Sequence, residues 1–133
     1  MQRSSGFTLL ELVTTNAVLA VVLALAIPGF QQLRRSVAIS AAFHELTASL
    51  ANARLLAVAR GVPVTVCPSQ DGRNCRKDRV WDGGWITFLD AARRDNPLSE
   101  SDVVHRYVSS PAVVAIRSTA GRDWLRFLPS GLS

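Results

Sequence analysis

The sequence has few of the residues from which metal centres and common active sites are built. It contains two cysteines, Cys67 and Cys75, and two histidines, His44 and His105, which are far apart along the chain. Structural zinc needs four ligands at close spacing, so these residues make a poor zinc set. The sequence also lacks a P-loop motif and any Ser/His/Asp or Cys/His motif. It therefore predicts neither an enzyme nor a cofactor site.

Lysine is almost absent. Lys77 is the only lysine among fifteen basic residues, and the others are arginines. Ten acidic residues leave a formal net charge of +5. Arginine is the better bidentate binder of phosphates and carboxylates, so one interpretation of this bias is an anionic partner, and the other is codon composition. A length of 133 residues is enough for one domain and not for two.

Charged residues are also scarce after the first five residues of the chain. The stretch "GFTLLELVTTNAVLAVVLALAIPGF", from Gly6 to Phe30, is apolar apart from a few uncharged polar residues and a single acid, Glu11. Its apolar run of about twenty residues is long enough to span a bilayer and longer than the 7–15 residues of a signal-peptide core. An acid in a membrane segment is usually functional and usually has a partner.

A cleavage between Gly6 and Phe7 would create such a partner. The new α-amine of Phe7 would be a cation one helical turn from Glu11, and it would also be available to the Glu11 of a neighbouring, staggered copy. Glu11 near a helix start is favourably placed for the helix macrodipole as well. A plain membrane anchor with an incidental acid is the alternative interpretation.

The run Gly6-Phe7-Thr8-Leu9-Leu10-Glu11 resembles the amino-terminal signal of type IV pilins and type II secretion pseudopilins. The resemblance implies that a prepilin peptidase cuts after Gly6 and methylates Phe7, that Glu11 docks the subunit into a filament, and that Pro28 kinks the helix. It also implies four segments: a leader over residues 1–6, a membrane-spanning or filament-core helix over 7–30, an amphipathic half of the same helix over 31–60, and a head domain over 61–133.

The pattern after Pro28 predicts a helix that continues to residue 60. One apolar face recurs at spacings of three and four residues and comprises Ile39, Phe43, Leu46, Leu50, Ala53 and Ala57. Gly61 and Pro63 predict the end of the helix at Arg60. From Phe7 onward the helix would be about 80 Å long.

Short β-branched and aromatic runs then predict an antiparallel sheet that covers the apolar helix face. The expected strands are 62–67, 85–90, 103–108, 112–117 and 124–128, with a turn at Asp71-Gly72. The predicted fold class is therefore α+β, a long amino-terminal helix packed on a small antiparallel β-sheet.

Three later stretches resemble the GspH/FimT branch of minor pilins. They are "RGVPVTVCPSQDGRNC", "WDGGWITFLD" and the Phe-x-Pro-x-Gly motif in "LRFLPSG". Members of that branch continue beyond this motif with further strands and a tail, whereas the sequence stops at Ser133, so part of the usual domain is expected to be missing.

The cysteines and tryptophans fit this picture. Outside the cytoplasm, Cys67 and Cys75 are expected to form a disulfide across a loop of about nine residues. The three tryptophans, Trp81, Trp85 and Trp124, are interpreted as core or cross-strand residues rather than as platforms for nucleic-acid bases.

Basic residues bunch in two places, which makes DNA a candidate partner. The candidate DNA-binding residues are Arg73, Arg76, Lys77 and Arg79, in or after the loop between the cysteines, and Arg117, Arg122 and Arg126 around the last strand. Some FimT-like members bind DNA through a Gly-Arg-x-Arg motif in the tail. Here Gly121-Arg122-Asp123-Trp124 lacks the second arginine, so DNA binding depends on charge alone, and a solvated face is the alternative.

These observations predict a FimT-like minor type IV pilin that assembles into a pilus, with DNA uptake as a further expectation. The alternative is a GspH-like minor pseudopilin of a type II protein secretion system. Expected partners are other pilins or pseudopilins, the prepilin peptidase, an inner-membrane assembly platform and, in the DNA-capturing case, non-specifically bound DNA. The expected location is the bacterial inner membrane, with the head in the periplasm, and then the pilus or pseudopilus.

Overall fold

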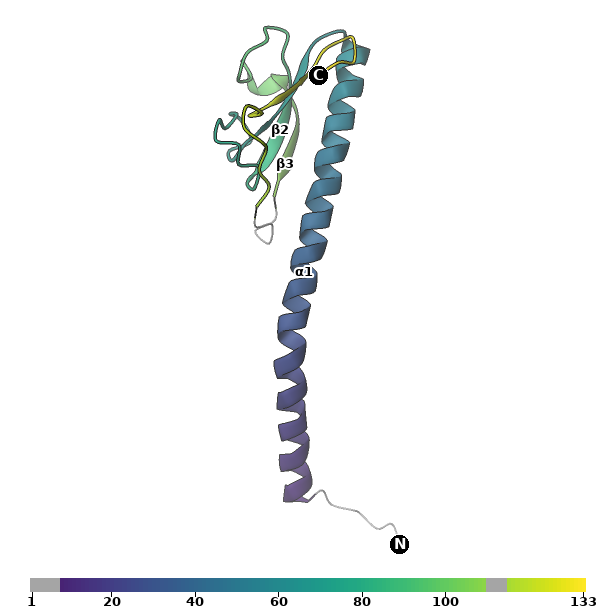
Figure 1. The fold of residues 1–133 in the computed structure, drawn as a ribbon, viewed down its shortest axis with the longest axis vertical. Coiled ribbons are helices and arrows are strands. Elements are labelled where there is room, and N and C mark those ends of the chain that lie inside the picture. Colours follow the sequence, from purple (N-terminus) through teal and green to yellow (C-terminus); the bar gives the residue numbers. More distant parts are fainter. Residues whose placement is uncertain (1–7, 110–114) are drawn as a thin grey trace. The chain divides into compact units, whose positions relative to one another are not determined.

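The computed structural model describes residues 8–109 and 115–133. It contains helix α1 (Leu9–Arg60), strands β1 (Val64–Pro68) and β2 (Gly84–Leu89), a short 3-10 helix η1 (Glu100–Asp102), and strands β3 (Val103–Val108) and β4 (Leu125–Phe127) (Figure 1). The chain divides into two compact units, residues 1–36 and 37–133, and each is described by itself.

The first unit contains the amino-terminal part of α1. The Thr8 hydroxyl caps the helix by accepting a hydrogen bond of 3.3 Å from the Glu11 amide, the bond that an N-cap residue makes. Helix formation continues through the Ala-, Leu- and Val-rich run and through Pro28, which has no N–H to donate to the preceding turn. The predicted start at Phe7 lies outside the described residues, and the kink at Pro28 stays a prediction.

The helix ends where the sequence predicts. Gly61 adopts a positive φ of 66°, and its amide donates a 3.0 Å hydrogen bond to the Ala57 carbonyl. This is the left-handed cap that glycine forms most easily, and Pro63 follows two residues later.

The second unit is a four-stranded antiparallel sheet with the carboxyl-terminal part of α1. The strand order is β3-β2-β1-β4, so the first two strands in the chain occupy the centre of the sheet. Gly84 opens β2 with a φ of 118°, and a Cβ there would clash with the Tyr107 carbonyl on β3. Glycine at this position therefore lets the two strands approach.

The α+β prediction is confirmed, and four of the predicted strands form within two residues of their expected ends. The fifth, 112–117, falls partly on residues 110–114, which lie outside the described residues. Of its remainder, Arg117 forms an isolated antiparallel bridge with Val80.

The main core lies between the sheet and the helix. Val64, Val66 and Trp85 face Ala53 and Ala57 and are fully buried. The Trp85 indole N–H donates a 3.0 Å hydrogen bond to the Ser49 hydroxyl, and its ring stacks on Tyr107 at 4.0 Å. A smaller cluster on the opposite face of the sheet comprises Cys67, Ile86 and Phe88.

The predicted helix face needs one correction. Ile39 and Phe43 are 48% and 66% exposed, and the buried positions are the small residues Ala42, Ser49, Ala53 and Ala57. Leu46 and Leu50 pack partly against the core, as predicted. The difference follows from size, because bulky indole rings on the sheet leave room only for small side chains on the helix that faces them.

Candidate functional site

Glu11 lies in the first turn of α1 with its side chain exposed. Within the described residues it makes no ion pair. The Thr14 and Thr15 hydroxyls donate to its backbone carbonyl at 3.0 and 2.9 Å, so these polar groups are satisfied inside the helix. The role of Glu11 in subunit docking stays a prediction. Gly6 and Phe7 are not among the described residues, and their roles stay predictions.

The helix around Glu11 is exposed on all sides in this single chain. Large apolar side chains from Leu9 to Phe30 are about half exposed or more, including Leu9 at 81% and Leu25 at 75%. Within the described residues, α1 is long and apolar enough to cross a membrane. An apolar surface of this extent normally has a lipid or protein cover, so it is consistent with membrane anchoring.

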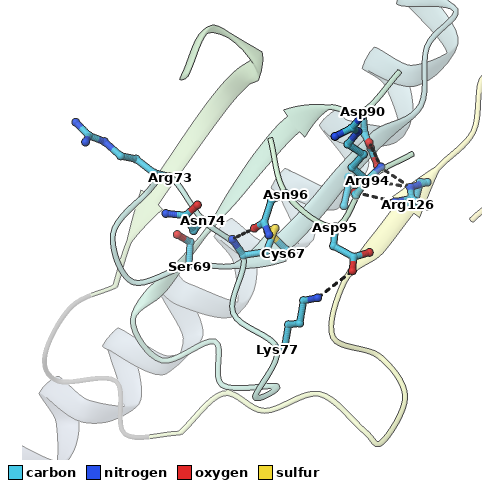
Figure 2. Close-up of a disulfide and its surroundings, with 12 residues drawn as sticks. Cys67, Ser69, Arg73, Asn74, Lys77, Asp90, Arg94, Asp95, Asn96 and Arg126 are labelled. Atoms are coloured by element: carbon cyan, nitrogen blue, oxygen red, sulfur yellow. Dashed lines mark hydrogen bonds and ion pairs between the residues drawn. A yellow bond between two sulfur atoms is a disulfide. The ribbon is translucent and has the colours of Figure 1, made fainter. Parts of the chain in front are cut away.

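The expected disulfide between Cys67 and Cys75 is present, with Cα atoms 5.5 Å apart. It closes the loop that follows β1 (Figure 2). The Cys75 amide donates a 2.7 Å hydrogen bond to the Asn96 side chain, and Lys77 forms a 2.9 Å ion pair with Asp95. These contacts join the disulfide loop to the segment that follows β2.

Asp71 organises the interior of this loop. Its carboxylate accepts hydrogen bonds from the amides of Arg73 and Asn74 at 2.9 and 2.8 Å, and from the Ser69 hydroxyl at 3.1 Å. These bonds, the one from the Asn74 amide above all, hold the pKa of Asp71 well below its ordinary value. The loop therefore keeps this negative charge among its basic residues even in acidic solution that would protonate an ordinary aspartate.

Removing the disulfide is expected to destabilise the head by roughly 2.6 kcal/mol, the chain-entropy value for a loop of about nine residues. The test is thermal unfolding of the Cys67→Ala/Cys75→Ala variant by near-ultraviolet circular dichroism, which reports on the head because all three tryptophans lie there. Reductant should lower the unfolding temperature of the wild type and leave the variant unchanged. Two free thiols in the unreduced wild-type protein would contradict the bridge.

Most of the candidate DNA-binding residues around the disulfide have acidic partners. Arg73 lies 3.4 Å from Glu100, Arg76 pairs with Asp78, and Lys77 pairs with Asp95. The Arg73 side chain extends away from the loop, toward solvent (Figure 2). Exposed pairs of this kind are weak, but each acid lowers the local positive potential that a phosphate would meet.

Arg126 is placed differently from the sequence-based expectation. Its side chain is only 15% exposed, and its Nε lies 2.7 Å from the Asp90 carboxylate, which is itself 2% exposed. It also donates to the Arg94 carbonyl at 3.0 Å (Figure 2). The guanidinium lies over the Trp124 ring at 4.4 Å. The Arg126 guanidinium thus neutralises a buried acid inside the head, and its predicted DNA-binding role stays a prediction that this ion pair disfavours.

The three remaining basic candidates are Arg79, Arg117 and Arg122, whose backbones lie close together and which are here called the basic patch. All three are exposed, and none has an ion pair within the described residues. Val80 bridges to Arg117, the Ser118 amide donates to the Arg79 carbonyl at 3.2 Å, and the Ser118 hydroxyl donates to the Arg122 carbonyl at 2.6 Å. Backbone contacts thus gather residues that are distant in the sequence.

The tryptophans fall into two groups. Trp81 and Trp85 are 3% and 0% exposed, which confirms their interpretation as core residues and leaves no face for a nucleic-acid base. Trp124 is 37% exposed and carries the Arg126 guanidinium on its ring.

A groove of about 440 Å³ lies between α1 and the β3 side of the sheet. Its lining is mostly apolar, with Leu55, Leu56 and Val104, and His105 lies 3.7 Å from Glu45 at its edge. No cluster of three or more His, Cys, Asp or Glu side chains that could hold a metal occurs in residues 8–109 or 115–133.

Comparison with known proteins shows the family of this chain. The family model of the type II transport protein GspH matches residues 42–133, more than half of the chain. The chain belongs to the GspH family. This family consists of structural, non-enzymatic pseudopilins, so the GspH assignment confirms that the chain is not an enzyme and that it is pilin-like.

A second similarity points to fimbriae. The chain is 35% identical over 72 residues to "Fimbrial protein EcpB" of Eikenella corrodens, which covers 54% of this chain and 45% of that protein. The match therefore spans less than half of the relative's length. No solved structure matches the chain. The GspH match favours the predicted alternative, a GspH-like pseudopilin, over the more specific FimT-like pilin.

Sequence reasoning missed the role of Asp90 and its partners. The position of Asp90 directly after a buried strand could have indicated a buried ion pair, because acids are almost never fully buried without a partner. The identity of that partner had no signal, since Arg126 is far along the chain and reaches Asp90 only through the pairing of β4 with β1.

Proposed function

We propose that the chain is a minor pseudopilin of a type II protein secretion system. The GspH match over residues 42–133 carries this proposal. The exposed apolar helix with its single acid supports it, because a filament subunit needs an apolar segment that can exchange lipid for neighbouring helices. The minor-pilin role in a pilus is the rival, and the similarity to a fimbrial protein supports it.

In the proposed mechanism the chain is first stored in the inner membrane with its head in the periplasm. Prepilin peptidase removes residues 1–6 after Gly6 and methylates Phe7. The assembly platform then moves the helix, residues 7–30, into the filament core. There the Glu11 carboxylate pairs with the Phe7 amine of a neighbouring pseudopilin, so that neither charge is left unpaired in an apolar environment.

Cleavage after Gly6 is the first expected result. The mature chain should begin with methylated Phe7 when the full-length protein is made together with a prepilin peptidase, and intact-mass spectrometry measures this directly. Gly6→Leu should block cleavage, because the peptidase is expected to accept only a small residue before the cut, while Gly29→Leu serves as the control. A chain that keeps Met1 in the presence of active peptidase would contradict the predicted processing.

Deleting the gene in its host separates the two filament systems. Loss of exported enzymes with normal pili supports the pseudopilin proposal, and complementation with the wild-type chain should restore export. Loss of pili with normal export supports the pilus rival and overturns the secretion proposal.

DNA binding is a second candidate function, and the basic patch is the observation that favours it. Three exposed arginines without ion pairs among the described residues suit phosphate contacts, and no element here is shaped to read base edges. Binding would be independent of sequence, with a dissociation constant on the order of 10⁻⁴–10⁻⁶ M.

The expected result is a change in the salt dependence of binding. If all three arginines contact phosphate, Arg79→Asn/Arg117→Gln/Arg122→Gln should flatten the log–log slope on duplex DNA by about 2.7. Asn is chosen at Arg79 because φ there is 63°. The matched control, Arg73→Gln/Arg76→Gln/Lys77→Gln, removes the same charge from paired positions and should change the slope less. A gel shift of the full chain in neutral detergent measures both, and absence of a shift at low salt removes this candidate function.

A further inference from the structure

The first unit contains a long stretch without charge, bounded by charges of opposite sign. Residues 12–33 include no Asp, Glu, Lys or Arg, and the stretch begins after Glu11 and ends at Arg34 and Arg35. All of it is helical in α1, so at 1.5 Å per residue it measures about 33 Å. The hydrocarbon core of a bilayer is about 30 Å thick. When this helix spans a membrane, Glu11 therefore lies at one interface and the two arginines lie at the other.

Two of the polar side chains inside this stretch, Thr14 and Thr15, do not disturb that register. The Thr14 and Thr15 hydroxyls donate to helix carbonyls at 2.9–3.0 Å, so they need no water. The side chains from Leu12 to Leu33 are all exposed, and no other described part of the first unit covers them. Lipid can therefore contact the whole stretch.

Among residues 8–109 and 115–133, no acidic side chain neutralises Arg34 or Arg35. Both are exposed, and neither has an ion pair within the described residues. The nearest acids along the helix are Glu11 and Glu45, each more than two turns away. Consecutive residues point about 100° apart around a helix, so the two guanidinium groups reach different lipids at the same depth.

We propose that Arg34 and Arg35 bind the phosphate groups of anionic phospholipids in the leaflet on the head side of the membrane. Guanidinium groups make bidentate, charge-assisted hydrogen bonds to phosphate, and each basic residue beside an anionic membrane surface gains about fivefold in affinity. The pair anchors the stored subunit at a defined depth, and leaving the membrane for a filament requires these contacts to be broken. This inference depends on the proposed membrane storage.

The test measures phospholipid binding by the full chain. Native mass spectrometry is run on protein released from neutral-detergent micelles that contain either phosphatidylglycerol or phosphatidylcholine. The wild type is expected to bind phosphatidylglycerol about 30-fold more tightly than phosphatidylcholine. Arg34→Gln/Arg35→Gln should weaken phosphatidylglycerol binding by about 30-fold and leave phosphatidylcholine binding unchanged.

The control is Arg54→Gln/Arg60→Gln, which removes the same charge from two exposed positions near the carboxyl end of α1 and should retain wild-type lipid binding. Equal binding of the two lipids, or unchanged phosphatidylglycerol binding in Arg34→Gln/Arg35→Gln, overturns the proposal. If Arg34→Gln/Arg35→Gln binds phosphatidylglycerol normally but is no longer incorporated into filaments, the two arginines instead pair with an acid of a neighbouring subunit. Carbonate extraction of cell membranes tests storage separately: a chain that is washed off overturns the proposed function and this inference together, whereas a chain that stays leaves only the lipid measurement to decide.

Discussion

Glu11→Ala is expected to lower incorporation of the chain into filaments on the order of 100-fold while leaving it in the membrane. The reason is the charge pair proposed for the filament core. Removing one partner of a buried pair costs about 3–5 kcal/mol, because the remaining charge, here the Phe7 amine of a neighbour, stays unpaired in an apolar environment. Membrane insertion should persist, since the rest of the apolar helix is unchanged.

The measurement is the ratio of the chain in sheared filaments to the chain in membranes, determined by quantitative immunoblotting. Glu45→Ala is the matched control, because it removes the same side chain from the head end of the same helix. Glu11→Gln separates two roles. It keeps a side chain that can serve in a capping box with Thr8 but removes the charge, so it should fail as Glu11→Ala does. Normal incorporation of Glu11→Gln would show that Glu11 caps the helix rather than docks the subunit.

Arg126→Met is expected to be the most destabilising single substitution of a basic residue in the head, by about 3–5 kcal/mol. It leaves the Asp90 carboxylate, which is 2% exposed, with only the Thr65 hydroxyl at 2.8 Å and the Arg94 amide at 2.6 Å as donors. For a domain of this size the unfolding temperature should fall by roughly 15–30 °C.

Near-ultraviolet circular dichroism of the full chain in neutral detergent measures this unfolding through the tryptophans. Arg122→Met, at an exposed position, should change stability little and serves as the control. Asp90→Asn/Arg126→Met should be more stable than Arg126→Met alone, because the neutral amide no longer buries a charge. A wild-type unfolding temperature for Arg126→Met would show that Asp90 does not depend on this partner.

The positions of basic residues in the sequence do not show which of them are free to contact a phosphate, as Arg126 and the basic patch illustrate. Seven basic residues were equivalent candidates in the sequence. In the structure, Arg126 neutralises a buried acid, three pair with exposed acids, and Arg79, Arg117 and Arg122 have no ion pair among the described residues. Each outcome depends on which acid the fold brings near, and these acids lie two to thirty-six residues away in the chain.

Features encoded within a few neighbouring residues could be predicted from the sequence. The end of α1 at Arg60 needs only a glycine that tolerates positive φ and a nearby proline, and the four strands need only their own β-branched and aromatic residues. The Cys67–Cys75 bridge spans a single short loop, and the amino-terminal motif is six residues long. Sheet order, the small-residue face of α1 and the burial of Arg126 against Asp90 required the tertiary structure. Those features depend on which strand pairs with which and on how closely the helix approaches the sheet, and both are properties of packing between distant segments, which the spacing of residues along one segment does not encode.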